Sequence, residues 1–481
     1  MAIFLILTAP LAASALSFFV RKKIGLLNFI AVVASALELL AAIAIVSAVV
    51  KNGSYSLGNN FSVDSLGAVV MLTLAITSFP IAIYSVGYLK AEIAKGIIGF
   101  QRIKQYFILF HLFILAMFFA ILTTSSILMW IGIEATTLST AFLISFYNKP
   151  SAMEAAWKYL IINSLGLLLA FFGTLLFLYP ALNGGHHELI TWRALLASGS
   201  GMDPFIAKMA FIFILIGYGT KVGLVPMHTW RPDAYSKTPV PVVALFSGSL
   251  LNVAFLAILR FKLVADLSVG KEFSQNLFIF FGLASIIVAA FSIFAQKNYK
   301  RLLAYSSIEH AGIMALGFGF GGAGALAALF HMVYHALAKS MLFLSAGNIF
   351  LKYSSTKIKN IRGVMSVLPV TGALFILGFL AVTGVPPFGI FITEFSILSA
   401  GIGSHPFVAI VALLGIALVF IGFLKHIIAM MFGENDQNIS QGETSVWLVA
   451  PIIFLAAILL VTGFFIPTAI KSLITAATLA Y

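Results

Sequence analysis

The sequence contains no cysteine. Cysteine thiolates hold Fe–S clusters, form CxxC redox motifs and attach c-type haem, so this chain can hold none of these groups through thiolates. Any electron transfer linked to the protein must therefore occur elsewhere, and we expect no cofactor in this chain.

Charged residues are also scarce. They make up 9% of the chain, whereas 61% of the residues are hydrophobic. A soluble domain has about 25% charged residues. Apolar runs of about 20 residues recur from end to end, which indicates an all-α polytopic membrane protein rather than a β-barrel. No polar stretch is long enough for a separate domain, so residues 1–481 are expected to form a single transmembrane bundle.

The apolar runs predict about fourteen spans. Their expected ranges are 2–20, 24–50, 66–89, 106–122, 124–147, 155–179, 205–223, 239–259, 277–296, 302–320, 323–351, 367–403, 406–431 and 446–470. Proline removes a backbone donor, so Pro226 should break the seventh helix at its end, and Pro386 and Pro387 should interrupt the twelfth. The longest connection, 180–204, is expected to be an exposed loop.

The net charge of +13 could suggest nucleic acid, but the basic residues lie mainly in short loops between apolar runs. We assign nineteen Lys and Arg residues, Arg231 included, to loops on the side away from the N-terminus. Seven, Lys262 included, fall on the other side, and Lys221 and Lys339 lie at membrane depth. This bias predicts a cytoplasmic (inner) membrane protein with both termini outside. The bilayer, not nucleic acid, is the expected partner.

Two sets of ionisable residues have matched spacing. The first set is Glu134, Glu154, Lys158 and Lys221, at offsets 0, 20, 24 and 87. The second set is Glu309, His331, His335 and Glu394, at offsets 0, 22, 26 and 85. Each set includes a proline-broken helix, and five spans separate the sets, so the halves should be inverted repeats of the transporter type. The predicted divisions are helices 1–3 in 1–105, a first repeat in 106–262, a second in 273–432 and a last helix in 446–481.

Glu134 and Lys221 are the strongest functional candidates. A buried lysine is costly in hydrocarbon, so it normally faces water or a partner. If Lys221 approaches Glu134, both groups stay charged; if it moves away, the proton can pass to the carboxylate. The alternative is that Glu134 is simply kept protonated in an apolar bundle.

Lys158 follows Glu154 by one helical turn. An i, i+4 pair of this kind is usually a minor helix stabiliser. The alternative is that Lys158 is a relay group and that Glu154 modulates it. The sequence leaves both interpretations open.

His331, His335 and Lys339 recur every four residues and so share one helix face. Two histidines at this spacing can bind zinc, but we find no third ligand and no HExxH glutamate, so we expect no metal. A titrating stripe fits better, because histidine changes charge near neutral pH. Glu309, His310 and Glu394 would extend this stripe.

Lys425 is either an exit group or a residue that extends to the interface. His228, Arg231 and Asp233 lie in the first helix break. There we favour turn capping and helix anchoring, with Pro232 fixing the turn. A gating or modulating role stays open for His228 and Asp233, because they lie close to Lys221 in the chain.

Four blocks carry a family resemblance: KVGLVPMHTWRPDAYSKTPVPVVALFSGSLLN, QKNYKRLLAYSSIEHAGIMALG, ALFHMVYHALAKSMLFLSAG and GVPPFGIFITEF. They resemble the signature blocks of the antiporter-like subunits of respiratory complex I, Mrp cation/proton antiporters and membrane-bound NiFe hydrogenases. The resemblance implies fourteen core helices, two inverted five-helix repeats and a chain of charged groups across the membrane midplane. It places the fifth-span glutamate at Glu134 and the broken-helix lysine at Lys221.

The chain departs from the family in the span after the first broken helix. Many members carry lysine there, whereas this span offers Ser247, Ser249, Asn252 and the terminal Arg260. Water would have to bridge this gap. The YSSIEH block is similar to hydrogenase-linked members.

The sequence therefore predicts a non-catalytic subunit that moves protons, with or without coupling to Na⁺. Redox chemistry in other membrane subunits of a hydrogenase-type or related complex would drive it. The alternatives are a subunit of a complex I-type NADH/quinone dehydrogenase, an Mrp-type or stand-alone cation/proton antiporter, and a structural subunit whose charges have no role.

Overall fold

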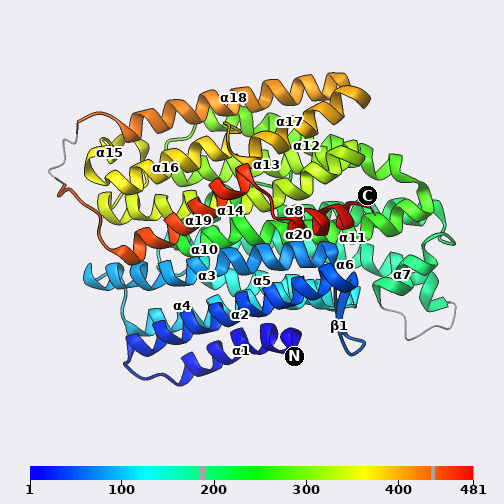
Figure 1. Ribbon diagram of the computed structural model, residues 1–481, viewed down its shortest axis with the longest axis horizontal. Helices are drawn as coiled ribbons and strands as arrows, with labels where there is room; N and C mark the ends of the chain where they lie inside the picture. Colours follow the sequence, from blue (N-terminus) through cyan, green and yellow to red (C-terminus); the bar gives the residue numbers. More distant parts are fainter. Residues whose placement is uncertain (184–190, 435–438, 480–481) are drawn as a thin grey trace.

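The computed structural model describes residues 1–183, 191–434 and 439–479. Most of the long helices run nearly parallel to one another through one bundle (Figure 1). In the described residues the only sheet is a hairpin of β1 (Ser54–Leu57) and β2 (Phe61–Asp64), paired antiparallel. The predicted all-α membrane fold is confirmed.

The helices fall into three groups along the chain. The first group is α1 (Ala2–Phe19), α2 (Ile24–Asn52), α3 (Ser65–Ala94), α4 (Phe100–Leu122), α5 (Ser126–Ile144) and α6 (Pro150–Asn183). The second is α7 (Trp192–Gly199), α8 (Pro204–Val222), α9 (Trp230–Lys237), α10 (Val240–Leu245), the π-helical turn η1 (Phe246–Leu250) and α11 (Leu251–Val269). The third is α12 (Lys271–Phe294), α13 (Tyr299–Phe320), α14 (Gly322–Tyr353), the 3₁₀ turn η2 (Ile358–Asn360), α15 (Val364–Val367), α16 (Pro369–Val382), α17 (Gly389–Ser404), α18 (Pro406–Met431), α19 (Val446–Phe464) and α20 (Thr468–Thr478).

The helix count agrees with the predicted fourteen spans. In the described residues, 12 helices are long and apolar enough to cross a membrane, counting α10, η1 and α11 as one. The more polar α13 and the interrupted pair α16/α17 complete the set.

Several boundaries differ from the prediction. The span expected at 239–259 continues to Val269, and the last one ends at Phe464 before the separate α20. The connection expected as an exposed loop at 180–204 contains the end of α6 and all of α7, while residues 184–190 lie outside the described part.

The two repeats share one packing scheme. In the first, α4 packs on α5 and α5 on α6, while α8 and α9 pack against α6. In the second, α12 packs on α13 and α13 on α14, while α16 and α17 pack against α14. Five crossings separate α4 from α12, an odd number, so the repeats are inverted as predicted.

Both helix breaks begin at a glycine with a positive φ angle. Gly223 (φ 78°) ends α8, and Gly384 (φ 64°) follows α16. Residues with side chains rarely adopt this conformation. An added Cβ at Gly384 would also collide with Oε2 of Glu394, so that carboxylate would have to move. The predicted breaks near Pro226 and at Pro386 and Pro387 are therefore present.

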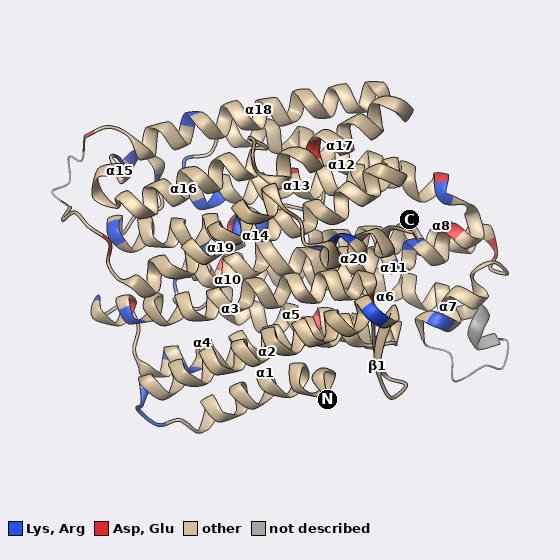
Figure 2. Ribbon diagram, viewed as in Figure 1, with Lys and Arg blue, Asp and Glu red and all other residues tan. Residues whose placement is uncertain are grey.

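The charged residues lie mostly toward the two ends of the bundle (Figure 2). Three cations that we assigned to loops are buried, however. Arg231 and Lys262 are each 1% exposed, and Lys300, in the first turn of α13, is 3% exposed. Lys262 forms an ion pair with Asp266 one turn later, because α11 continues past its predicted end. The loop assignment was wrong for all three residues.

Glycines let α6 and α8 approach closely. A Cβ at Gly217 of α8 would lie 2.5 Å from the backbone nitrogen of Ala170 and 2.6 Å from the oxygen of Gly166 on α6. Small residues allow such contacts between membrane helices. The contact sets the distance between α8, which carries Lys221, and α6.

Replacing Gly217 by Ala should therefore separate α6 from α8. We expect a loss of stability of about 1–3 kcal/mol, as for other overpacked sites, measured by thermal unfolding of the assembled protein in detergent. Gly25→Ala is the matched control, because a Cβ there meets nothing within 4 Å. Equal melting temperatures for the two variants would contradict the role of the contact.

Candidate functional site

Lys221 lies at the end of α8 and is buried. Its Nζ donates hydrogen bonds to Oγ1 of Thr137 on α5 (2.8 Å) and to the hydroxyl of Tyr159 on α6 (2.7 Å). The Tyr159 ring also lies under the ammonium, 5.0 Å from its centroid. Two hydroxyls and an aromatic face thus replace part of the hydration that the lysine loses.

Glu134 approaches Lys221 through Thr137 rather than directly. Thr137 Oγ1, which accepts from Lys221, donates to Oε2 of Glu134 at 3.4 Å. Ser164 of α6 donates to Oε1 of Glu134 at 3.1 Å. The structure thus brings the predicted pair together with a hydroxyl between them, an arrangement in which a proton can shift along hydrogen bonds.

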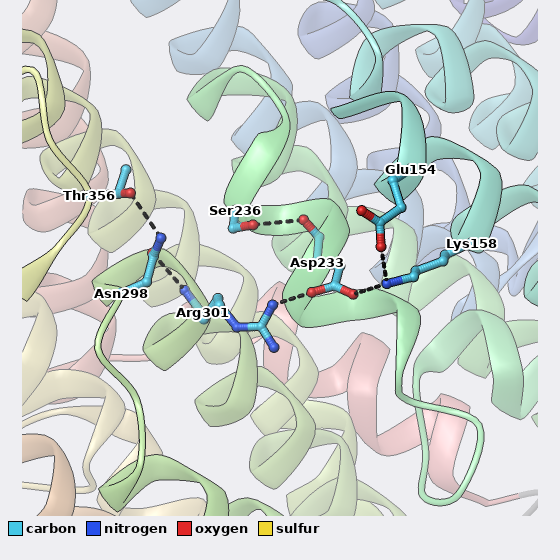
Figure 3. A network of polar contacts seen from close by, with 7 residues as sticks. All are labelled: Glu154, Lys158, Asp233, Ser236, Asn298, Arg301 and Thr356. Carbon is cyan, nitrogen blue, oxygen red and sulfur yellow. Dashed lines mark hydrogen bonds and ion pairs between the residues drawn. The ribbon is translucent and has the colours of Figure 1, made fainter. Parts of the chain in front are cut away.

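Lys158 lies elsewhere, in a network of ion pairs (Figure 3). Its Nζ is 2.6 Å from Glu154 and 3.4 Å from Asp233 of α9, and Asp233 also pairs with Arg301 of α13. The side chains of Lys158 and Glu154 are 49% and 64% exposed. Lys158 therefore lies in a half-exposed network of ion pairs, whereas Lys221 is buried.

The second buried cluster begins at Lys339 on α14. Lys339 Nζ donates to the Leu303 carbonyl of α13 at 3.3 Å. His335, one turn earlier on α14, is fully buried, and neither of its ring nitrogens has a hydrogen-bond partner in the described residues. Glu309 is buried on α13. These groups share the interior between α13 and α14.

The cluster continues through two more histidines to α17. His310 Nδ1 lies 2.9 Å from His331 Nε2, and His331 Nδ1 lies 2.9 Å from Oγ1 of Thr393. Glu394 Oε1 is 4.0 Å from His310 Nδ1. The predicted stripe on α14 is therefore part of a larger cluster drawn from three helices.

These three imidazoles also correct one step of the sequence analysis. Nitrogens of His310, His331 and His335 all lie within 4.8 Å of one another, so a third potential metal ligand exists on α13. Sequence spacing could not reveal it, because His310 lies on a different helix. The direct contact between His310 and His331 suits a proton relay as well as it suits metal binding.

The remaining candidates, Lys425 and His228, lie outside the two buried clusters. Lys425 is exposed on α18, and its neighbour His426 contacts the Ile293 carbonyl through Nε2 at 3.2 Å. His228 is partly buried in the first break, and its Nδ1 has no partner among the described residues. Their proposed exit, gating and modulating roles stay predictions.

Sequence reasoning missed three side chains. Thr137 follows Glu134 by three residues and Tyr159 follows Lys158 by one, but only their contacts with Lys221 single them out. Arg231 was treated as an anchor for the helix break, although its guanidinium is buried in the bundle and donates to the Ser307 carbonyl of α13 at 3.2 Å. A basic residue two positions before an acidic one in a turn gives no sequence signal for such burial.

Comparisons with known proteins agree with this architecture. Residues 123–422 match the family described as NADH:quinone oxidoreductase/Mrp antiporter, TM. The hydrogenase-4 component F homolog of Methylacidiphilum infernorum (isolate V4) is 38% identical over 380 residues, covering 78% of this chain and 80% of that protein. The Na(+)/H(+) antiporter subunit A1 of Staphylococcus haemolyticus (strain JCSC1435) is 27% identical over 88% of this chain, but the match covers 55% of that longer protein.

A solved structure shares the fold. A chain of the membrane-bound sulfane sulfur reductase, an archaeal respiratory membrane complex, superposes with a TM-score of 0.87 at 23% identity, covering 100% of this chain and 96% of that one. The family match extends over more than half of the sequence and includes both helix breaks. The chain is therefore an antiporter-like membrane subunit that belongs to the NADH:quinone oxidoreductase/Mrp antiporter family.

Proposed function

We propose that this chain translocates protons across the membrane as one subunit of a multi-subunit complex. The observation that carries the proposal is the pair of buried polar clusters in the two repeats. In the first, hydrogen bonds join Glu134, Thr137, Lys221 and Tyr159. In the second, Lys339, His335, His331 and His310 lead to Glu394. Ionisable groups inside a membrane bundle are expensive and mark ion pathways.

The side chains act by holding and passing protons. Thr137 accepts from Lys221 and donates to Glu134, so reorienting one hydroxyl allows a proton to leave the ammonium and reach the carboxylate. In the second cluster each imidazole can accept a proton on one nitrogen and release one from the other. Neither step requires a metal or a cofactor bound to this chain.

Redox chemistry in partner subunits would supply the driving force. The relatives include hydrogenase and respiratory membrane components, and the chain has no cysteine to hold an Fe–S cluster of its own. The partners are then other membrane subunits of a hydrogenase-type or related redox complex. The excess of basic residues on one side favours the cytoplasmic membrane, with both termini outside.

Lys221→Met in the intact complex should abolish proton translocation and lower electron flux, because the two processes are coupled. Translocation would be followed with a pH-gradient dye in vesicles while electron transfer is measured in parallel. Lys208→Met is the matched control, because Lys208 lies on the same helix but is exposed. Normal pumping by the Lys221 variant would favour a purely structural subunit.

Thr137→Val tests the hydroxyl between Lys221 and Glu134. Valine keeps the shape of the side chain but can neither accept nor donate a hydrogen bond, so we expect translocation to fall by roughly tenfold, equivalent to about 1.4 kcal/mol on the barrier. Thr137→Ser restores the hydroxyl and should restore most of the rate. If valine and serine behave alike, the proton does not pass through this position.

Reconstitution of the purified chain alone distinguishes a subunit from a stand-alone antiporter. We expect no Na⁺-driven proton exchange in proteoliposomes that contain only this chain, whereas the assembled complex should acidify or alkalinise the lumen when its redox donor is added. Robust exchange by the isolated chain would instead support an independent antiporter.

A further inference from the structure

Arg231 is a cation in the region that connects the two buried clusters. It lies on α9, is 1% exposed, and no carboxylate lies within 4 Å of it in the described residues. Its Nη1 donates to the Ser307 carbonyl, and its Nε has no hydrogen-bond partner there. The guanidinium also lies over the rings of Trp230 and Tyr235, 5.7 and 5.6 Å from their centroids. These contacts stabilise a cation, but no carboxylate balances its charge, and a charge buried at this depth is costly.

One side of the guanidinium faces the first cluster. A Cβ at Gly223, two residues after Lys221, would lie 3.0 Å from Cζ of Arg231, so the guanidinium rests against the end of α8. Trp230, next to Arg231, donates its indole N–H to the Thr220 carbonyl at 2.9 Å. The Trp230 ring also packs edge-on against Tyr159, which binds Lys221.

The other side faces the second cluster through Ser307. The Ser307 carbonyl accepts a hydrogen bond from Arg231. The Ser307 hydroxyl donates to the Leu303 carbonyl at 3.1 Å. The same Leu303 carbonyl accepts from Lys339 at 3.3 Å. One turn of α13 therefore joins Arg231 to Lys339.

The central helix is locally distorted at this point. The span formed by α10, η1 and α11 makes a π-helical turn at η1, where Ser247 Oγ lies 2.8 Å from Ser307 Oγ. Such turns occur frequently at functional sites. Near Arg231, the hydroxyl of Tyr235 is also buried without a partner in the described residues. Polar atoms of this kind are commonly satisfied by ordered water.

We propose that Arg231 is the permanent positive charge that couples the two halves of the proton pathway. This inference rests on the proposed function. A guanidinium does not release its proton in proteins, so Arg231 is a positioning residue rather than a carrier. Its guanidinium rests against the end of α8, two residues after Lys221, and is linked through Ser307 and Leu303 to Lys339. A movement of this charge toward one lysine disfavours a proton there and favours a proton on the other lysine, so the protonation of the two lysines is coupled.

The test replaces Arg231 by Gln, Met or Lys in the assembled complex. Glutamine can still donate to the Ser307 carbonyl but carries no charge, methionine lacks both properties, and lysine keeps the charge without the planar group. Protons translocated per electron are measured in vesicles and corrected for the amount of assembled complex. We expect the ratio to fall by about tenfold in both neutral variants and to recover at least about half in Arg231→Lys.

Two reference variants separate the possible failures. Arg260→Met removes a cation of the connected helix α11 that pairs with Asp64, and it should leave the ratio unchanged. Lys221→Met reports on the pathway itself. A normal ratio in Arg231→Gln together with loss in Lys221→Met would overturn the role of Arg231 and leave the proposed function intact. A normal ratio in Lys221→Met would overturn the proposed function instead. Loss in all three Arg231 variants would show that the guanidinium, not the charge, is needed and would also overturn the inference.

Discussion

The interior of a membrane bundle provides little water to stabilise an ammonium group, and the position of Lys221 depends on how the protein compensates for this. Here the compensation comes from Thr137 on α5 and Tyr159 on α6. The contact with Tyr159 requires α8 to lie very close to α6, which the glycine-mediated contact at Gly217 provides. The break that follows Lys221 then turns the chain so that α9 can bring Arg231 back into the bundle. The packing of α8 and α9 therefore determines where the charges of Lys221 and Arg231 lie.

The two repeats have the same helix arrangement but surround their buried ionisable groups with different side chains. The first surrounds a lysine with hydroxyls, whereas the second places three imidazoles next to a carboxylate. Lys221 precedes its helix break, but Glu394 follows the second one. Lys158 points outward from α6, while His335 points inward from α14. The repeats therefore match in helix arrangement but not in the positions of their charges, and the two buried clusters contain different ionisable groups.

Hydrophobicity and proline were sufficient to predict most of the fold. The length of a membrane-crossing helix and the loss of a backbone donor at Pro226, Pro386 and Pro387 are local properties, so the spans and breaks could be read from the sequence. The partnership of Glu134 and Lys221 was also predictable, because a buried lysine needs a partner. The direction in which Lys158 points could not be predicted, because it depends on how α6 is rotated against α8. The burial of Arg231 was missed for a related reason, because a short helix after a break can turn either face toward the core.

The short helix α9 is held by both repeats, and this explains why the ion-pair network in Figure 3 matters despite its exposure. Exposed ion pairs contribute about 0–1 kcal/mol each, so the network adds little to stability. Its geometry is more informative. Asp233 pairs with Lys158 of the first repeat and with Arg301 of the second, while Arg231, two residues away, reaches Ser307 inside the bundle. Any displacement of α9 must therefore change the surface pairs and the buried guanidinium together. A partner subunit that altered the pairing of Lys158 or Glu154 at the surface would in this way act on the charge between Lys221 and Lys339.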